Sequence, residues 1–239
     1  MNYQRLNYET ISVLVPTYNR SKFLPLFLLN IKKQKYPHDK IHVIIDDDGD
    51  TPFINDLNYV RQVLHPMKVL YSYNRERRTI GKKRNNLIKM CKTKIFAFMD
   101  DDDIYHNTYL THSYETLKSK KVGCVGSDKM LFCMTDKNFD VHAIDCGDNV
   151  RMIHEASLMM TKKWYNASNK FNNHNTGEGK QLFDGFENDV AITDIMKCML
   201  CVQHGDNTIN KLQFAKDDNK IDIEITDDFK NILNDILKK

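Results

Sequence analysis

Four consecutive aspartates, Asp100–Asp103, directly follow the apolar run "FAFM". Aspartate disfavours strands and helices, and adjacent carboxylates repel one another, so either a solvated turn or a metal site would explain this placement. Mg²⁺ and Mn²⁺ prefer oxygen ligands. An Asp-x-Asp pair places two carboxylates on one face of an extended segment, and both Asp100/Asp102 and Asp101/Asp103 have this spacing. The run therefore indicates a divalent-cation site.

Two further polar clusters follow predicted strands. The β-branched run that begins at Ile11 ends in Pro16–Arg20, and the run that begins at Lys40 ends in Asp46–Asp50. In an open parallel sheet, ligands bind beyond the carboxyl ends of the strands. Any one cluster could be a solvated turn, but all three together predict an acidic, hydroxyl-bearing pocket at one sheet edge.

The elements that must position these clusters alternate along the first half of the chain, which is typical of an open parallel α/β sheet. Strands are predicted at 11–19, 40–50, 67–73, 94–103 and 122–128, and helices at 21–34, 53–64, 79–93 and 108–121. Ser21 and Thr226 are the expected N-caps of their helices. After residue 128 we expect short, partly antiparallel strands at 129–136, 139–147, 156–164 and 197–204. The Asn-rich segment 165–180 is predicted to be a mobile loop, with a helix starting at about Gly179.

We therefore expect one domain over residues 1–210, with a first half at 11–128 and a second half at 129–210. Residues 211–239 would form a connector and a C-terminal helix at 226–239, whose apolar stripe favours docking on the same domain. Self-association through this helix, giving a homodimer, is the weaker alternative.

Composition narrows the function classes. The chain has 239 residues, 41% hydrophobic and 28% charged, with a formal net charge of +3, which argues against binding nucleic acid through bulk positive charge. The polar N-terminus lacks the apolar core of a signal peptide, and no apolar run approaches the roughly 18 residues of a membrane span. These features predict a cytoplasmic protein without a transmembrane segment. The six cysteines, including the Cys198/Cys201 pair, are expected to be reduced and buried.

A Rossmann dinucleotide site would need G-x-G-x-x-G after the first strand, and the first turn here contains no glycine. "TIGKKRN" does not fit the spacing of a Walker A loop either. A bound nucleotide must then be held by side chains and a cation.

The series "VPTYNR", the acidic D-D-G turn, "GKKRN" and "FMDDDD" resembles the nucleotide-sugar half of family 2 glycosyltransferases of the GT-A fold, over residues 11–128. "EGKQLF" and "HGDNT" are similar to segments of small members of that family. The resemblance implies a Rossmann-like, mostly parallel sheet with helices on both faces, followed by a smaller mixed-strand acceptor half. It also implies a metal-dependent, inverting enzyme that uses Mn²⁺ or Mg²⁺. Such an enzyme moves one sugar from a UDP-sugar to a hydroxyl of a glycan, protein or lipid-linked acceptor.

Matched residue by residue, the resemblance assigns donor-nucleotide contacts to Pro16, Thr17, Tyr18, Arg20, Asp47, Asp48, Gly81, Arg84, Asp100 and Asp101. It assigns metal contacts to Asp102, Asp103 and His204, which make up the acidic DXD motif and a C-terminal histidine. Asp100 would face the ribose and Asp102 the metal. Which two of the four aspartates bind the cation is left undecided, with Asp100 and Asp102 favoured. The turn departs from the family's usual D-D-G-S because Asp50 replaces the serine.

An inverting transfer also needs a general base for the acceptor hydroxyl. Glu178 is the first candidate, and Asp184, Glu187 and Asp189 are the alternatives. Trp164 is a weak candidate for an acceptor contact. Two other functions remain open: a nucleotidyltransferase or pyrophosphorylase, and an inactive GT-A-like module that binds sugar nucleotides.

Overall fold

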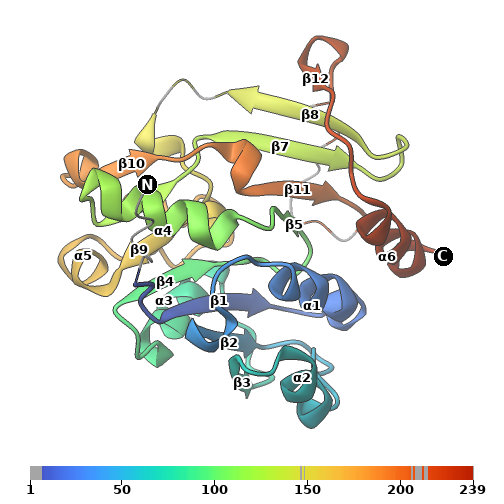
Figure 1. The fold of residues 1–239 in the computed structure, drawn as a ribbon, viewed down its shortest axis with the longest axis horizontal. Helices are drawn as coiled ribbons and strands as arrows, with labels where there is room; N and C mark the ends of the chain where they lie inside the picture. Colours follow the sequence, from blue (N-terminus) through green and yellow to red (C-terminus); the bar gives the residue numbers. More distant parts are fainter. Residues whose placement is uncertain are drawn as a thin grey trace, which may run out of the picture.

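The structure is a computed structural model that describes residues 7–145, 147, 149–205, 207, 212 and 215–238. Its larger sheet has the strand order β10-β6-β9-β4-β1-β2-β3 (Figure 1). The strands are β1 (Ile11–Thr17), β2 (Ile41–Asp47), β3 (Lys68–Tyr73), β4 (Ile95–Phe98), β6 (Cys124–Gly126), β9 (Met159–Thr161) and β10 (Val190–Ile192). β1 to β4 run parallel, whereas β9 is antiparallel to both β4 and β6. This arrangement confirms the predicted α/β class.

Both faces of the sheet are covered, because side chains on a strand point alternately to opposite faces. Val13 and Val15 join the core cluster on one face, and Leu14 between them joins the cluster on the other. The helices are α1 (Leu24–Lys32), α2 (Leu57–Leu64), α3 (Ile80–Met90), α4 (Tyr109–Lys120), α5 (Lys162–Ala167) and α6 (Asp227–Leu237).

A second sheet has the order β12-β8-β7-β11-β5 (Figure 1). Its strands are β5 (Ile104–Tyr105), β7 (Lys129–Met134), β8 (Asp140–Asp145), β11 (Met199–Gln203) and β12 (Lys220–Ile221). β4 of the first sheet ends just before the four aspartates, and β5 of the second sheet begins just after them. The aspartates therefore join the two sheets, and β11, which pairs with β5, brings His204 close to them.

Short 3₁₀ helices lie between the described helices and strands. They are η1 (Ser21–Phe23), η2 (His38–Lys40), η3 (Val150–Met152), η4 (Glu155–Ser157), η5 (Glu187–Asp189), η6 (Ile195–Lys197) and η8 (Asp217–Asn219). Because η1 precedes α1, the N-cap of α1 is Phe23 instead of the predicted Ser21. Thr226 is the N-cap residue of α6, as predicted, but its side chain makes no capping hydrogen bond. By contrast, Asp56 caps α2 by accepting from Tyr59 N–H at 3.0 Å.

The helix predicted from about Gly179 is wrong, because residues 178–186 form successive turns. Leu182 N–H donates to the Gly179 carbonyl at 2.9 Å, which is the i to i+3 pattern of a turn. Gly177 and Gly185 take left-handed backbone conformations (φ +62° and +82°) on either side of this stretch. A conformation of that kind ends a regular helix.

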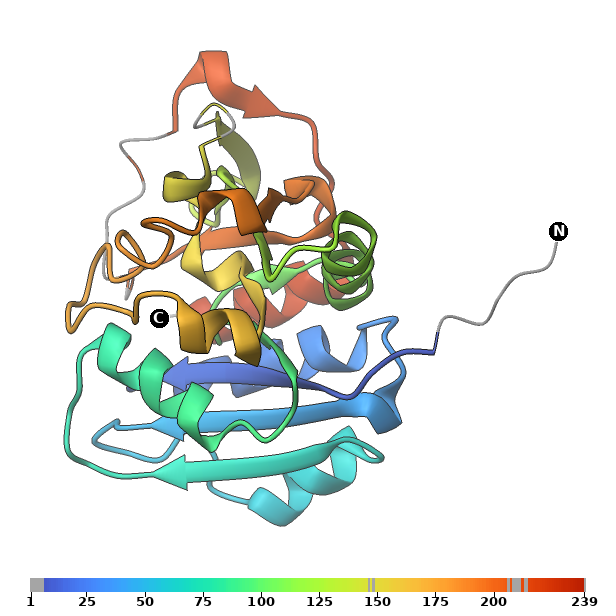
Figure 2. The ribbon, with the colours of Figure 1, turned by 90° about the vertical axis from the view of Figure 1, so that its left-hand side faces the viewer.

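Residues 165–167, predicted as the start of the Asn-rich loop, belong to α5 instead. The rest of the segment is irregular, as predicted, and is attached to the start of α3 (Figure 2). Gly81 N–H donates to the His174 carbonyl at 3.1 Å, and Asn85 Nδ2 donates to the Phe171 carbonyl at 2.8 Å. These bonds bring Glu178, at the end of the segment, against α3.

α6 packs against α1 through its apolar stripe, of which Phe229 and Leu233 are buried. The Lys33 ammonium lies 2.7 Å from the Asp228 carboxylate and 5.3 Å from the centre of the Phe229 ring. The most buried part of the stripe is therefore covered within the chain and is not free to contact a second copy. Among the described residues, no helix has the length and apolar character needed to cross a membrane.

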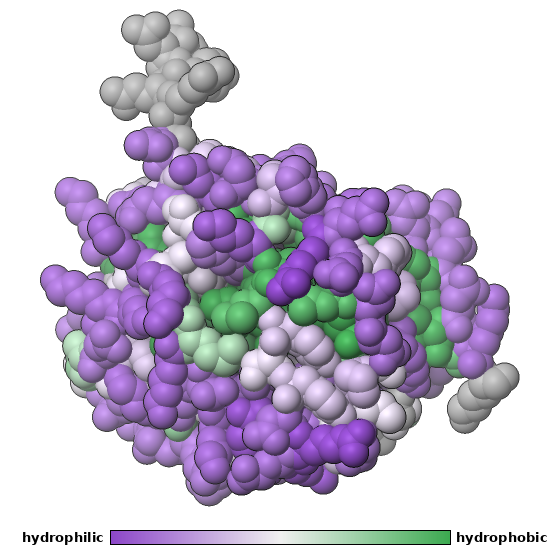
Figure 3. Space-filling model, turned by 90° about the horizontal axis from the view of Figure 1, so that it is seen from below, coloured by the Kyte–Doolittle hydropathy of each residue, from purple (hydrophilic) through white to green (hydrophobic). Residues whose placement is uncertain are grey.

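The face seen from below in Figure 1 carries an apolar patch across its middle, surrounded by hydrophilic side chains (Figure 3). The edge strand β3 and helix α2 lie at this end of the molecule (Figure 1). Leu70 on β3 and Tyr59 on α2 are among the large exposed hydrophobic side chains.

Candidate active site

The three polar clusters meet at one edge of the larger sheet. β1 lies between β2 and β4, in parallel register with both, so that Thr17 pairs with Asp47 and Leu14 with Phe98. Their carboxyl ends therefore point the same way; the arrowheads of β1 (dark blue) and β3 (teal) show this direction in Figure 2.

After β1, Asn19 takes a left-handed conformation (φ 53°) and bonds to the turn after β2. Its Nδ2 donates to the Asp50 carboxylate at 2.8 Å, and its Oδ1 accepts from Asp50 N–H at 2.7 Å. Asp50 thus joins the two turns. Pro16 and Thr17 are buried, whereas the Tyr18 ring is partly exposed, with the Arg77 guanidinium 4.4 Å from its centre.

Asp47 holds the turn after β2. One carboxylate oxygen accepts from Gly49 N–H at 2.9 Å. The other accepts from Phe53 N–H at 2.7 Å and from the Tyr71 hydroxyl at 2.6 Å. Because Asp47 is completely buried, its carboxylate already has the partners that such burial requires.

Asp46 and Asp48 bind basic side chains near α3. Asp48 accepts from the Lys83 ammonium and from Arg78 N–H, the latter at 2.7 Å, while Asp46 accepts from the Arg78 guanidinium at 2.9 Å. Lys83 also donates to the Thr17 carbonyl at 2.6 Å. Burial lowers the pKa of Lys83, and the charge of Asp48 opposes that effect. These contacts tie α3 to β1 and β2. Asp47 and Asp48 therefore support the turn, and because both are buried they expose almost no surface to a nucleotide base.

The aspartate run is not an extended segment. β4 ends at Phe98, and residues 101–103 form a turn and bend, so the expectation that Asp100 and Asp102 lie on one strand face is wrong. Asp100 pairs with both terminal nitrogens of Arg84, at 3.2 and 3.3 Å. Asp102 Oδ2 lies 3.2 Å from Arg20 and 3.1 Å from His204 Nε2.

The other two aspartates of the run are buried. Asp103 Oδ1 accepts from the Val202 N–H of β11 at 2.9 Å, so this carboxylate is bonded to the second sheet. Burial raises the pKa of Asp101 well above its ordinary value; the charge of Asp102 adds to the effect and the Thr17 hydroxyl opposes it. Asp100 and Asp102 are therefore the members of the run that remain partly exposed.

Arg84 links the aspartate run to the second half of the chain. Its Nε donates to Glu178 at 3.1 Å, and its guanidinium carbon lies 4.7 Å from the centre of the Phe98 ring. Burial alone would lower the pKa of Arg84, but the charges of Asp100 and Glu178 outweigh it and raise the pKa. Burial raises the pKa of Glu178, and the charge of Glu155 adds to that effect while Arg84 opposes it.

His204 follows β11 and lies next to the aspartates. Its backbone N–H donates to Asn207 Oδ1 at 2.6 Å, and its ring is 4.7 Å from that of Phe23. A cavity of about 960 Å³ adjoins it, lined by Lys22, Thr135, Asp136, His204, Gly205 and six residues of the C-terminal segment from Asn231 to Lys238.

Asp102 and His204 are the predicted metal ligands that converge. Across the residues for which the structure gives positions, no group of three or more His, Cys, Asp or Glu side chains is arranged to hold a metal ion. Two protein donors are nevertheless enough where phosphate oxygens complete the coordination, as is common for Mg²⁺ sites.

The structure places several other predicted residues away from ligand contact. Trp164 is 4% exposed and packs near Phe183 and Phe186, so the acceptor contact expected of it is not supported. Gly81 is buried; a Cβ there would lie 1.7 Å from the Asn172 carbonyl oxygen, so its function is to let α3 approach the loop.

The alternative general bases also have protein partners. Asp184 and Glu187 both pair with Arg151, at 3.2 and 2.7 Å, and Asp189 accepts from Gly123 N–H at 2.9 Å. The five cysteines of the described residues are buried and form no disulfide with one another, as expected, and Cys146 lies outside those residues.

Sequence reasoning missed three side chains that organise this site. Asn30 on α1 donates to the Asp103 carbonyl and accepts from Tyr105 N–H, each at 2.8 Å. The Tyr105 hydroxyl in turn accepts from Asp100 N–H at 2.8 Å. Glu155 on η4 accepts from Gly179 N–H at 3.1 Å, next to Glu178. The sequence signal for Asn30 is a polar residue on the apolar face of a helix, whereas Glu155 carries no local signal.

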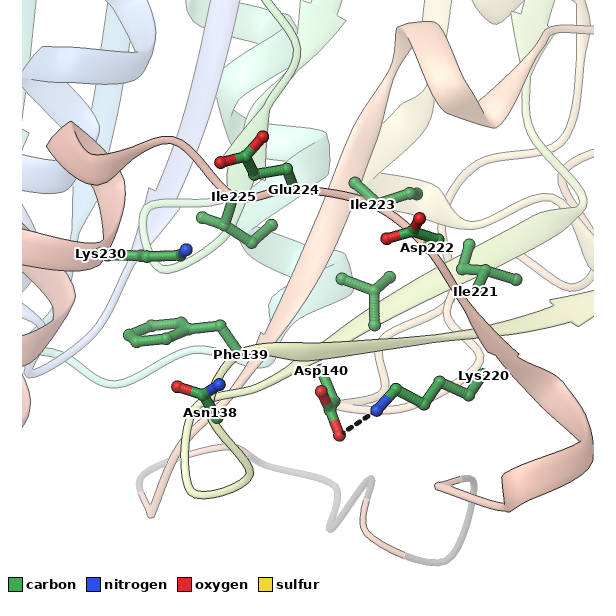
Figure 4. Close-up of a pocket in the computed structure, with 11 residues that line it drawn as sticks. Asn138, Phe139, Asp140, Lys220, Ile221, Asp222, Ile223, Glu224, Ile225 and Lys230 are labelled. Carbon is green, nitrogen blue, oxygen red and sulfur yellow. Dashed lines mark hydrogen bonds and ion pairs between the residues drawn. The ribbon is translucent and has the colours of Figure 1, made fainter.

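A second cavity, of about 510 Å³, lies between the start of β8 and the segment 220–225 (Figure 4). An ion pair between Asp140 and Lys220 (2.7 Å) spans its rim, and Lys230 of α6 also lines it. None of the strand-end residues described above is among its lining residues, so it is separate from the candidate active site.

Comparison with known proteins agrees with this geometry. A model of the family described as "Glycosyl transferase family 2" matches residues 12–186. The chain belongs to glycosyl transferase family 2. The predicted family is thereby confirmed.

Two curated glycosyltransferases are similar to parts of this chain. Glycosyltransferase GlyG of Streptococcus pneumoniae serotype 4 is 28% identical over 132 residues, which are 55% of this chain and 42% of GlyG. The poly(ribitol-phosphate) beta-N-acetylglucosaminyltransferase TarS of Staphylococcus aureus is 30% identical over 93 residues, 38% of this chain and 16% of TarS. The matched segments thus span less than half the length of these relatives.

Solved structures share the GT-A fold at low identity. The structure of S. aureus TarS 1-349 in complex with UDP-GlcNAc superposes with a TM-score of 0.61 at 16% identity, covering 95% of this chain and 65% of that one. The mannosyltransferase PcManGT from Pyrobaculum calidifontis, in complex with GDP-Man and Mn²⁺, has a TM-score of 0.58 at 18% identity, covering 82% and 57%. The predicted fold is confirmed.

Proposed function

We propose that this chain is a metal-dependent, inverting glycosyltransferase that moves a single sugar from a UDP-sugar to an acceptor hydroxyl. Its family supports sugar transfer, and the UDP-GlcNAc complex of TarS supports a UDP-sugar as the donor. The observation that carries the proposal is the meeting of three strand-end clusters at one sheet edge, with the Asp102 carboxylate 3.1 Å from His204.

On the donor side, the partly exposed groups are the ones available to a nucleotide. Tyr18 offers a ring for stacking on the base, because it is partly exposed while Pro16 and Thr17 are buried. Asp100 offers a carboxylate for the ribose hydroxyls, held in place by Arg84. Arg20 offers a guanidinium suited to the phosphates.

For the cation, we propose Asp102 and His204 as the protein ligands. A carboxylate oxygen and an imidazole nitrogen that converge suit Mn²⁺, and a carboxylate with phosphate oxygens suits Mg²⁺. Arg20 lies 3.2 Å from the same Asp102 oxygen, so it must move from that oxygen when a cation binds. The bound cation would act as a Lewis acid that stabilises the negative charge developing on the leaving diphosphate.

Isothermal titration of UDP and of GDP, each with and without Mn²⁺, tests the donor and the cation together. We expect UDP to bind in the presence of Mn²⁺ and to bind at least 10-fold more weakly without it. Asp102→Asn, which keeps the side-chain shape, should remove most of the Mn²⁺ effect. Glu115→Gln, at an exposed position on α4, is the control and should behave as wild type. If neither nucleotide binds under any condition, the proposal is wrong; if GDP alone binds, the donor assignment is wrong.

A further inference from the structure

We propose that Glu155 is the general base of the transfer and that Glu178 is a positioning residue that holds Arg84. This inference rests on the proposed function. Glu155 would accept the proton of the acceptor hydroxyl while that oxygen bonds to the donor's anomeric carbon. The bond from this carbon to the diphosphate oxygen breaks in the same step, and its electron pair leaves with UDP.

Glu178 is poorly placed to take a proton from an acceptor. Its carboxylate is engaged by Arg84 at 3.1 Å, and the residue is only 5% exposed. Arg84 is itself committed to Asp100 through both of its terminal nitrogens. Moving Glu178 toward a substrate would therefore leave a buried guanidinium short of a partner, which is costly.

Glu155 lies next to the contacts among Asp100, Arg84 and Glu178, and it is more exposed to solvent than Glu178. It is half-buried, and its Oε1 accepts a hydrogen bond from Gly179 N–H at 3.1 Å. A backbone amide is a neutral partner, so this bond does not neutralise the carboxylate. The negative charge of Glu155 is felt at both Arg84 and Glu178, which places it in the same electrostatic cluster.

The backbone around Glu155 is attached to the aspartate run. Within η4, the carbonyl of Ala156 accepts from the Tyr105 hydroxyl at 3.2 Å, and this same hydroxyl binds Asp100 N–H. Just after η4, the Leu158 carbonyl accepts from Phe98 N–H at 2.9 Å, at the end of β4. Glu155 therefore lies in a segment that is hydrogen-bonded to the end of β4 and, through Tyr105, to Asp100.

Gly179 provides the space that Glu155 uses. A Cβ at position 179 would lie 2.8 Å from both Cγ and Oε1 of Glu155, closer than real Cβ atoms come to other atoms. Unlike Gly177 and Gly185, Gly179 does not have a positive φ, so its backbone does not require glycine. The absence of a side chain at 179 is thus explained by the carboxylate that occupies its place.

The test compares Glu155→Gln, Glu178→Gln and the control Glu115→Gln in the full chain. The assay is Mn²⁺-dependent release of UDP from UDP-glucose, UDP-galactose and UDP-GlcNAc, with water as the acceptor, alongside calorimetry of UDP. We expect Glu155→Gln to lower kcat about 10²–10⁴-fold, the usual worth of a general base, with donor KM and UDP affinity within about 3-fold of wild type. Glu178→Gln should instead raise donor KM, because it loosens Arg84 and Asp100.

Gly179→Ala gives a second measurement, because its methyl group displaces the Glu155 carboxylate without altering either acid. It should lower kcat at least 10-fold and leave UDP affinity unchanged. The inference is overturned if Glu155→Gln stays within 2-fold of wild-type kcat, or if Glu178→Gln shows the selective loss of kcat instead. A wild type that binds UDP but releases none from any of the three sugars also overturns it. Absence of UDP binding is a different result and refutes the proposed function itself.

Discussion

Replacing Arg84 by methionine tests the electrostatic centre of the site. Arg84 is almost completely buried and makes three hydrogen bonds, two to Asp100 and one to Glu178. Methionine keeps much of the apolar contact with Phe98 but removes the charge. The side chain of Asp100 is 23% exposed and can be hydrated, whereas that of Glu178 is only 7% exposed and must stay charged without a partner or take up a proton.

The size of the effect follows from the protonation of Glu178 in the variant. Protonating a glutamate with the ordinary pKa of 4.5 costs about 1.4 kcal/mol for each pH unit above that value, so about 3 kcal/mol at pH 7. This sets the expected loss of unfolding free energy, near the low end of the range for breaking a buried ion pair. For a chain of this size, it corresponds to a fall of roughly 10 °C in Tm.

The pH dependence has a definite sign. Burial raises the pKa of Glu178 in the folded state above its unfolded value, so its stabilising contribution is complete below the unfolded pKa and is lost as pH rises through the folded pKa. In the Arg84→Met variant, the folded-state pKa of Glu178 rises further, because Arg84 no longer opposes the effect of burial. The stabilising contribution of Glu178 is then lost over a range that extends to higher pH. The deficit of the variant should therefore shrink from about 3 kcal/mol at pH 7 to less than about 1 kcal/mol at pH 5.

Thermal and urea unfolding at pH 5, 6 and 7 measure this deficit. Arg61→Met, at an exposed position on α2, is the matched control and should cost less than about 0.5 kcal/mol at every pH. In the Arg84→Met background, Glu178→Gln should restore stability at pH 7, because it removes the unpaired charge. A deficit that is equal at pH 5 and pH 7, or no restoration in the double variant, would refute the reasoning.

Two further substitutions test how the site is supported. Gly81→Ala places a methyl group 1.7 Å from the Asn172 carbonyl oxygen, so it should separate the loop from α3 and lower Tm by several degrees. Gly205→Ala is the control, because its methyl group has open space and should leave Tm unchanged. Equal melting temperatures for the two variants would refute the packing role of Gly81. Leu233→Ala on α6 should lower the free energy of unfolding by about 2–5 kcal/mol in urea, because Leu233 is fully buried. Asn234→Ala, at an exposed position on α6, is the control. If Leu233→Ala loses no more stability than Asn234→Ala, α6 does not need its contact with α1.

The parts of the fold that could be predicted from the sequence are those with local causes. The runs that became β1, β2 and β4 are apolar and end in polar clusters, so both the parallel sheet and the edge where the clusters meet follow from pattern alone. The apolar stripe of α6 is local in the same sense. The helix expected after Gly179 failed for a local reason as well, since glycine is compatible with the left-handed conformation but does not reveal when it is used.

The pairing of charges could not be predicted in this way. Spacing along the chain suggested that Asp100 and Asp102 share one face, but the turn after β4 sends them to different partners. Arg84 is 16 residues from Asp100, and His204 is 102 residues from Asp102, so tertiary packing alone brings them together. Glu155 illustrates the same limit, because its proximity to Glu178 depends on the path of η4 past a glycine 24 residues away.

Each carboxylate of the aspartate run has a separate means of charge compensation within the protein. Asp100 has Arg84, Asp102 has Arg20 and His204, and Asp103 has the Val202 amide. Asp101 is buried, which favours its protonated form. Two of these solutions use arginine, the residue best suited to phosphate as well as to carboxylate. Under the proposed function, a ligand that carries both a diphosphate and a divalent cation would exchange partners with the site, because the cation would bind Asp102 and Arg20 would turn to the phosphates. The proposed function therefore treats the aspartate run as a charge-balanced site in which such a ligand would replace protein partners.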